Sequence, residues 1–306
     1  MPSPTLLSGL SQIADAYDAI LCDVWGVIHN GREAFPAACA ALARYRSERG
    51  PVVLISNAPR PSRALYGQLE GVGTPREAWS AFVTSGDATR ALLAERAPGP
   101  VWKLGPDRDD PLYEGLGLDF TGRIEDASFI CATGPFDEEN ETPDDYLGRL
   151  EIALARGLEL ICANPDRMVQ KGDRLVLCAG AIADAYEAMG GKVVMAGKPH
   201  APIYARSLAE VEVQLGRPVD RSRVLCIGDG VSTDVLGAQR QGLDCLFLWG
   251  GVHAADLLDG AEAASAERAA AFLAKHEAVA KYAMPELVWE GNVRPMDGQA
   301  MKWRSK

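Results

Sequence analysis

Short apolar runs of strand length recur along this chain, and several of them stop abruptly at a polar residue. Ala19–Cys22 ends at the carboxylate of Asp23, and Val224–Ile227 is followed by Gly228 and Asp229. Apolar runs of this length, bounded by turn residues, are typical of strands that are buried on both faces of a sheet. Such strands occur in parallel sheets, so this pattern constrains the fold more than any other feature of the sequence.

Helical segments separate the apolar runs. Residues 35–50, rich in Ala and Arg, lie between the first strand and Val52–Ile55, and they end at a Gly-Pro pair, as helices commonly do. The alternation continues to the run at 81–85 and starts again from Phe129–Ala132 onward. Strands that alternate with helices form β-α-β units, which predicts an α/β protein with a parallel sheet and a second region of the same kind.

Two stretches have other compositions. Residues 98–111 are rich in Pro, Gly and Asp around the short run Val101–Leu104, which makes them a candidate passage between two domains. Residues 254–282 are rich in Ala, a strong helix former, and predict a helix near the end of the chain.

The net charge of -11 argues against nucleic acid or an anionic membrane as a partner, because phosphate backbones are bound by basic surfaces. A small phosphorylated ligand needs only local positive charge and stays compatible with this charge. The seven cysteines fall mostly in apolar runs and form no C-x-x-C pair, which indicates reduced thiols in a core. The first twenty residues hold no Lys or Arg, and no apolar run reaches membrane-spanning length. We therefore expect a soluble, cytoplasmic protein.

Polar groups that follow the predicted strands are chemically complementary. They are Asp23, Ser56 with Asn57, Lys198, and Asp229 with Asp234. Ligands of an open parallel sheet bind beyond the carboxyl ends of its strands. Three carboxylates gathered there would repel one another unless a cation lay between them, and Mg²⁺ takes such hard oxygen ligands together with a substrate phosphate. A lysine and a hydroxyl would neutralise phosphoryl oxygens, and an aspartate could attack phosphorus directly.

The order of these motifs resembles the haloacid dehalogenase superfamily, and in particular its class IIA branch, which includes sugar-phosphate, pyridoxal-phosphate and nitrophenyl-phosphate phosphatases. The resemblance extends over residues 17–260. It is carried by Asp23–Val27, Ile55–Asn57, Gly197–Pro199 and Gly228–Asp234, together with Asn164–Asp166, which looks like the cap signature of this branch.

The resemblance implies a nucleophile and a set of metal ligands. Asp23 would be both the nucleophile and a ligand of Mg²⁺, and the backbone carbonyl of Trp25 would be a second ligand. Asp229 would ligate the metal directly, whereas Asp234 would lie behind it or act through water.

The resemblance also implies the residues that bind the substrate. Ser56 would bind the phosphoryl group with Asn57 near it, and Lys198 would neutralise charge between the nucleophile and the phosphate. Asn164 and Asp166 would face the cleft.

The same resemblance implies the domain organisation. Residues 1–84 and 192–306 would form a discontinuous core, Rossmann-like with a doubly wound parallel sheet. Residues 85–191 would form an inserted, smaller α/β cap domain, which would exclude water and select the substrate when it closes.

One position departs from the family pattern. The residue two places after the nucleophile is usually a second Asp, the general acid and base, but here it is Trp25, and an indole cannot exchange protons at neutral pH. Loss of a general acid-base typically costs 10²–10⁴-fold in rate. The substrate could have a leaving group that needs no proton, or another residue could act, His29 being the nearest in sequence although such a histidine is more often an ordinary loop residue. Alternatively, the protein has given up turnover.

The sequence therefore predicts a Mg²⁺-dependent phosphatase that hydrolyses a small phosphorylated metabolite through an aspartyl-phosphate intermediate. The alternative is a catalytically weak relative that binds a phosphorylated ligand as a sensor or regulator. Trp25 either stacks on a substrate ring or walls off the site. Arg60 and Arg63 either contact phosphate or are ordinary surface residues. The sequence allows a homo-oligomer and leaves the identity of the substrate open.

Overall fold

The computed structural model describes residues 3–171, 174–251 and 266–291. The chain folds as two compact units. The first comprises Met1–Ile55, Gly67–Phe82 and Ser207–Lys306, and the second comprises Ser56–Tyr66 and Val83–Arg206. Each unit is built on its own, largely parallel sheet.

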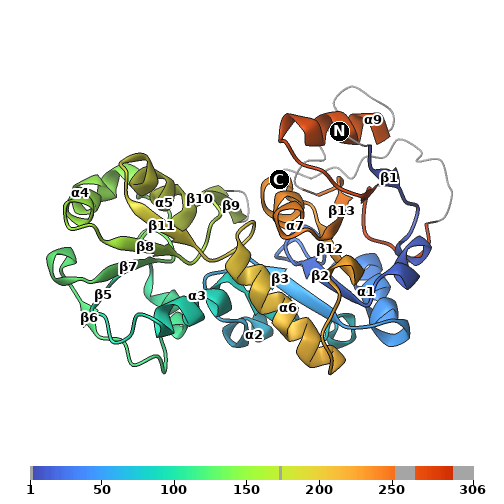
Figure 1. Ribbon diagram of the computed structural model, residues 1–306, viewed down its shortest axis with the longest axis horizontal. Coiled ribbons are helices and arrows are strands. Elements are labelled where there is room, and N and C mark those ends of the chain that lie inside the picture. Colours follow the sequence, from blue (N-terminus) through green and yellow to red (C-terminus); the bar gives the residue numbers. More distant parts are fainter. Residues whose placement is uncertain (1–2, 172–173, 252–265, 292–306) are drawn as a thin grey trace. The chain divides into compact units, whose positions relative to one another are not determined.

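The sheet of the first unit joins strands from both ends of the chain (Figure 1). Within the described residues its order is β1-β14-β13-β12-β2-β3-β4, and the pairs from β1 through β3 are parallel. The strands are β1 (Thr5–Leu6), β2 (Ala19–Asp23), β3 (Val52–Ser56), β4 (Ala81–Thr84), β12 (Val224–Gly228), β13 (Asp244–Leu248) and β14 (Tyr282–Met284).

The helices between these strands make the β-α-β crossovers that a parallel sheet requires. Those of this part of the chain are η1 (Leu10–Gln12), η2 (Ala14–Ala16), α1 (Pro36–Glu48), α2 (Tyr66–Gly71), η4 (Arg76–Ala78), α6 (Ala201–Leu215), η8 (Arg221–Arg223), η9 (Val231–Val235), α7 (Leu236–Gln241) and α9 (Ala266–Lys275).

The centre of this sheet is the point where its strand order reverses. From β2 the chain adds β3 and β4 toward one edge, and from β12 it adds β13 and β14 toward the other. Every residue of β2 and β12 is buried, as expected for central strands covered on both faces. Burial of a Leu or Ile side chain stabilises a fold by about 1.5–3 kcal/mol. The apolar runs therefore fix the two strands side by side, and the crevice beyond their carboxyl ends is where ligands bind in such sheets.

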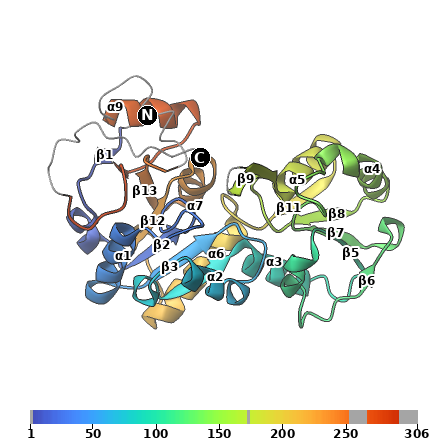
Figure 2. The ribbon, with the colours of Figure 1, turned by 180° about the vertical axis from the view of Figure 1, so that it is seen from behind.

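The second unit has a sheet with the order β11-β8-β7-β5-β6, in which neighbours pair in parallel (Figure 2). An antiparallel pair, β9 with β10, accompanies it. Its strands are β5 (Val101–Leu104), β6 (Phe120–Thr121), β7 (Phe129–Ala132), β8 (Glu159–Cys162), β9 (Met168–Lys171), β10 (Arg174–Leu177) and β11 (Lys192–Met195). Its helices are η3 (Ser62–Ala64), α3 (Ser85–Ala94), η5 (Asp107–Leu112), η6 (Ile124–Asp126), η7 (Pro143–Tyr146), α4 (Leu147–Ala155) and α5 (Ala179–Ala188).

Alternate residues of this second sheet pack into two buried clusters. Trp102 and Leu104 of β5 belong to the larger cluster, which also holds Tyr146 and Tyr186 from the helical segments. Val101 of the same strand belongs to the smaller cluster on the other face. The second unit thus has a core of its own, and the predicted α/β class is confirmed for both units.

Three details differ from the sequence patterns. Val101–Leu104 pairs with β6 and β7 inside the second sheet, so the prediction of a passage between domains at 98–111 is wrong. β11 pairs with β8, so this unit continues past residue 191. Of the helix predicted over 254–282, residues 254–265 lie outside the described residues, α9 ends at Lys275, and Tyr282–Met284 is a strand.

All seven cysteines are buried and none forms a disulfide, as their placement in apolar runs predicts. Among the described residues, no helix combines the length and the apolar character needed to cross a bilayer.

A partly exposed ion-pair cluster just before β2 provides a test of the fold's pH dependence. Asp18 accepts hydrogen bonds from Arg223 Nε (2.7 Å) and from Arg217 Nη2 (2.7 Å), and these arginines hold the pKa of the Asp18 carboxyl below its usual value. A lowered carboxyl pKa adds stability above the unfolded pKa of about 3.9, and this stability is lost as the pH falls through the folded value.

We therefore expect Asp18→Asn to lower the melting temperature at pH 7, and the difference from the parent protein to shrink as the pH falls below the unfolded pKa of about 3.9. The effect corresponds to at most about 1 kcal/mol, because solvent screens the arginines. Asp15→Asn is the matched control, since Asp15 pairs with Arg49 but its side chain is 83% exposed. Thermal unfolding followed by circular dichroism measures both variants, and a constant difference for Asp18→Asn across this pH range would contradict the assignment.

Candidate functional site

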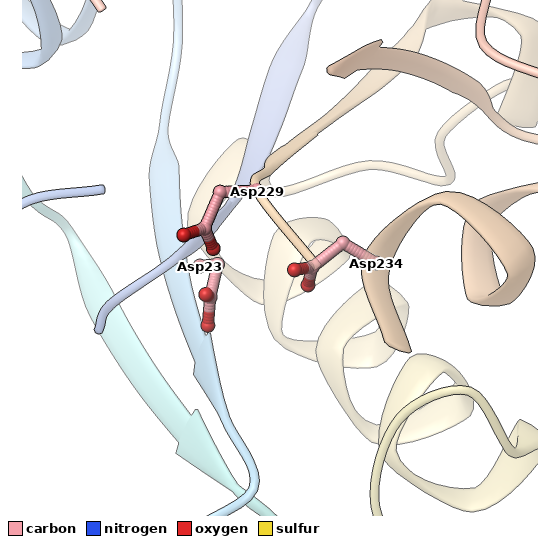
Figure 3. Close-up of side chains that lie close together, drawn as sticks. All are labelled: Asp23, Asp229 and Asp234. Atoms are coloured by element: carbon pink, nitrogen blue, oxygen red, sulfur yellow. The ribbon is translucent and has the colours of Figure 1, made fainter. Parts of the chain in front are cut away.

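Three buried carboxylates meet at the point where the strand order reverses. Asp23 is the last residue of β2, Asp229 follows the last residue of β12, and Asp234 lies in η9. Their oxygens lie within 4.8 Å of one another, and the three residues are 8%, 5% and 3% exposed. Figure 3 shows the carboxylates of Asp23 and Asp229 side by side and that of Asp234 directed toward them.

Glycines make this close approach sterically feasible. Gly26 has φ +82°, and a Cβ added there would lie 2.3 Å from Asp229 Oδ2. A Cβ on Gly251, just beyond β13, would lie 2.1 Å from the same oxygen. A Cβ on Gly228 would meet the Asp234 carboxylate at 2.2 Å, and the Gly230 N–H donates to Asp234 Oδ2 (3.0 Å). Glycine is needed at these positions because a side chain would displace a carboxylate.

The donor set fits a hard divalent cation. Two unit negative charges 4.8 Å apart repel by about 3–4 kcal/mol at an effective dielectric constant of 20, so the cluster requires positive charge nearby. Octahedral Mg²⁺ binds oxygens at 2.0–2.1 Å, which places those oxygens about 3–4 Å apart. A small inward shift of the three carboxylates reaches this spacing. The predicted role of the Trp25 carbonyl as a further ligand stays a prediction.

Trp25 belongs to the loop that follows β2, and its indole packs against other residues of this loop. Its ring meets the imidazole of His29 edge-on, with 5.4 Å between ring centroids, and a Cβ on Gly31 would lie 2.2 Å from the indole. Trp25 is nevertheless 45% exposed, in contrast to the buried carboxylates. The loop thus holds a large apolar surface in place where the family usually carries a carboxylate.

His29 has a structural role in the same loop. It is 2% exposed, its Nδ1 accepts a hydrogen bond from the Gly31 N–H (3.0 Å), and burial lowers its pKa. A buried neutral imidazole whose Nδ1 is already engaged by the backbone is poorly suited to replace the missing acid. Of the two interpretations of His29, the structure favours the ordinary loop residue.

A second group of predicted residues comes together in the second unit. The amide of Asn57 bonds to the backbone of Lys198 and to Asp166 Oδ1, the latter at 2.8 Å. Asn164 Oδ1 accepts from the Asp166 N–H (3.1 Å). Ser56, at the end of β3, accepts from the Ala58 N–H (3.3 Å). Four of the residues predicted from separate sequence motifs are therefore linked, and their roles toward a substrate stay predictions.

The two arginines near this group pair with carboxylates of the second unit. Arg60 Nε lies 3.7 Å from Asp109, which is buried, and Arg63 donates to Glu114 (3.1 Å). These ion pairs account for both side chains without a phosphate.

Some features of the site have little or no signal in the sequence. Gly251 follows the end of β13, next to the reversal point, and the Gly-Gly pair at 250–251 is the only local sign of the close approach. Ser85 contributes a buried hydroxyl beside Gly197, where an added Cβ would lie 2.8 Å from Ser85 Oγ. No motif marks that serine.

Comparison with known proteins agrees with the geometry. The profile of the haloacid dehalogenase-like hydrolases matches residues 20–119, and a second profile, described as HAD-hydrolase-like, matches residues 195–275. A solved haloacid dehalogenase-like hydrolase from Brucella suis 1330 is 43% identical; the similarity covers 94% of this chain and 100% of that one, with a TM-score of 0.79. The chain belongs to the haloacid dehalogenase-like family.

Curated relatives place it in the class IIA branch of this family. The 5'-nucleotidase YutF of Bacillus subtilis is 23% identical over 238 residues, which is 77% of this chain and 88% of that protein. The ribonucleotide monophosphatase NagD of Escherichia coli K12 is 24% identical over 244 residues, which is 78% of this chain and 90% of that protein. Members of this branch are phosphoric monoester hydrolases, and the resemblance derived from the motifs is confirmed.

The carboxylate cluster predicts a metal-dependent gain in stability. We expect millimolar Mg²⁺ to raise the melting temperature, by an amount that corresponds to about 2.7 kcal/mol at one hundred times the dissociation constant. Asp229→Asn should abolish this gain without lowering the melting temperature in EDTA, because it removes one of the repelling charges. Differential scanning calorimetry with Mg²⁺ or EDTA tests both statements; a full Mg²⁺ response in the variant would contradict them.

Gly26 gives an independent test of the same site. Gly26→Ala should also abolish the Mg²⁺ response, because its Cβ would push Asp229 aside. Gly73→Ala is the matched control: Gly73 has the same φ of +82° in the same unit, but open space surrounds the added Cβ. Both variants carry the same backbone strain, so an equal loss of Mg²⁺ binding by calorimetric titration would attribute the effect to strain alone.

Proposed function

We propose that this chain hydrolyses small phosphate monoesters with Mg²⁺ through an aspartyl-phosphate on Asp23. The observation that carries the proposal is the group of three buried carboxylates at the reversal point of the core sheet. The printed names of the relatives support the substrate class, since they describe a 5'-nucleotidase, a ribonucleotide monophosphatase and a D-glycerol 3-phosphate phosphatase.

The proposed reaction has two steps. In the first, an Asp23 oxygen attacks phosphorus, the bond between phosphorus and the leaving oxygen breaks, and the leaving group departs with the electron pair. In the second, water attacks the phosphorus of the acyl phosphate, which releases inorganic phosphate and restores the Asp23 carboxylate. The metal, when bound, neutralises phosphoryl oxygens and orients the phosphate.

Each side chain has a distinct task in this scheme. Asp229 and Asp234 would hold the metal, and the glycines around them allow the carboxylates to lie close together. The Ser56 hydroxyl donates to a phosphoryl oxygen, and the Lys198 ammonium neutralises negative charge that builds up during transfer. Asn164 and Asp166 contribute to recognition of the rest of the substrate.

Trp25 restricts the leaving group. Without a carboxylic acid two residues after the nucleophile, the departing oxygen receives no proton from that position. Monoesters whose leaving group is stable as an anion, such as aryl or enol phosphates, lose little from this absence, whereas alkyl phosphates lose most. We therefore propose that the metabolite has an acidic leaving group.

The second candidate function is that of a phosphate-ligand receptor with weak turnover. Two observations favour it: the exposed indole of Trp25 at the position of the acid, and the buried His29 with its Nδ1 engaged by the backbone. In that case the same cluster would bind a phosphorylated metabolite with Mg²⁺ but would release it unchanged.

The choice of leaving group separates the two functions. We expect Mg²⁺-dependent hydrolysis of p-nitrophenyl phosphate, abolished by EDTA and by Asp23→Asn, with alkyl phosphates such as glycerol phosphate slower by at least about 10²-fold. Steady-state release of phosphate with both substrates measures the ratio. No metal-dependent turnover on either substrate, together with Mg²⁺-dependent binding of a phosphorylated ligand, would favour the receptor.

Restoring a carboxylate tests whether the site is otherwise complete. Trp25→Asp should raise kcat for alkyl phosphates by about 10²-fold or more while changing kcat for p-nitrophenyl phosphate much less, because only the alkoxide needs a proton. Trp25→Asn is the matched control. Asn has the same size as Asp and also removes the indole, but its amide cannot act as a general acid. Equal gains in both variants would show that bulk, and not acid catalysis, limits the parent protein.

A further inference from the structure

The side-chain amide of Asn57 is fully engaged with other protein groups. Its Oδ1 accepts from the Lys198 N–H (2.7 Å), and its Nδ2 donates to the Lys198 carbonyl (3.1 Å) and to Asp166 Oδ1 (2.8 Å). A primary amide has two N–H donors, and both are used here. Asn57 therefore retains no donor for a substrate, although its position after β3 suggests substrate binding.

The two hydrogen bonds to the backbone of Lys198 are buried, and the one to Asp166 is partly buried. Asn57 is 6% exposed and Lys198 is 3% exposed. Bonds to both the N–H and the carbonyl of one residue fix its backbone as a strand partner would, and buried polar groups that lose such partners are costly. The backbone of Lys198 is thus held by a side chain from a segment that is far away in the sequence.

The side-chain amide of Asn57 is tightly packed against Gly197 and its neighbours. A Cβ added to Gly197 would lie 2.5 Å from Asn57 Oδ1, 2.7 Å from Pro165 Cδ and 2.8 Å from Ser85 Oγ. The loop that contains Asp166, the residue before the lysine and the amide therefore form one tightly packed group.

We propose that Asn57 is a positioning residue, which fixes the backbone of Lys198 and ties it to Asp166. This inference rests on the proposed function only for the task of the Lys198 ammonium, which is to neutralise the phosphoryl group. Asn57 acts through the lysine and does not touch the substrate. Part of the task of Asp166 is to accept the hydrogen bond that orients the amide.

The proposal predicts how the variants combine. Asn57→Ala lowers kcat for p-nitrophenyl phosphate by about 10–10²-fold, because misplacement of a charged group by about 1 Å has an effect of this size. KM changes by less than about threefold, since no substrate contact is lost. The double variant Asn57→Ala with Lys198→Ala is no slower than Lys198→Ala alone, because the amide acts through the lysine.

Conservative replacements test the hydrogen bonds themselves. Asp166→Asn keeps an oxygen that accepts from Asn57, so its kcat exceeds that of Asp166→Ala. Asn57→Asp keeps the shape and the oxygen that accepts from the Lys198 N–H but loses both donors, so its kcat lies below that of the parent protein. Asn140→Ala is the matched control: Asn140 also donates to an aspartate of the same unit (Asp137 Oδ2, 2.8 Å), but on the exposed surface, and its kcat equals that of the parent.

A readout that needs no turnover distinguishes this proposal from the proposed function. Hydrogen exchange followed by mass spectrometry should show faster exchange at the Lys198 amide in Asn57→Ala or, if that variant does not fold, in Asn57→Leu, which is close to Asn in size but has no oxygen to accept from this amide. If the parent protein lacks turnover but the Lys198 amide exchanges faster in the Asn57 variant, the proposed function fails, whereas the role of Asn57 in fixing the Lys198 backbone is supported. A raised KM at unchanged kcat, multiplicative losses in the double variant, or unchanged exchange at Lys198 would overturn the inference.

Discussion

Mutual repulsion of three buried carboxylates is the constraint on which the functional part of this structure depends. Asp23, Asp229 and Asp234 lie close enough that they are compatible with one another only beside positive charge, and their oxygens are near the spacing of an octahedral metal shell. The backbone accepts this arrangement because Gly26 and Gly251 carry no side chain where the carboxylate of Asp229 lies. The repulsion among the carboxylates and the close approach of the glycine backbone thus indicate the same site, at the carboxyl ends of β2 and β12.

The sheet topology decides where that place is. The β2 and β12 strands are far apart in the sequence, yet they pair in parallel, with Cys22 beside Ile227. Their neighbours are added outward in opposite directions, so the crossovers leave the carboxyl ends of these two strands open to a ligand. Because β2 and β12 are buried along their whole length, polar side chains are unfavourable within them. The polar groups of the site therefore lie at the ends of these strands.

The chain has carboxylates suited to metal binding and nucleophilic attack, but it lacks a proton donor at the position where the family usually carries one. The carboxylates that we propose for metal binding and nucleophilic attack lie together, whereas Trp25 occupies the usual position of the proton donor and packs against His29 and Gly31. In the second unit, the amide of Asn57 couples the lysine to the loop that carries Asp166. The buried polar contacts described here position charged groups, and none of them places a proton donor at the usual position. This arrangement agrees with the proposal of a substrate whose leaving group is already a stable anion.

The sequence by itself determined the strand runs, the polar residues at their ends, the family and the missing acid, because burial and periodicity are encoded locally. It misassigned 98–111, since the Pro and Gly residues that flank β5 have the composition of a linker although the strand lies within a sheet. Only the tertiary structure decided that Asp23 meets Asp229 and Asp234, that Gly251 makes room for them, and that Asn57 bonds to Lys198. These facts depend on which distant segments pack together, and that choice follows from the burial of the whole chain and from no local pattern.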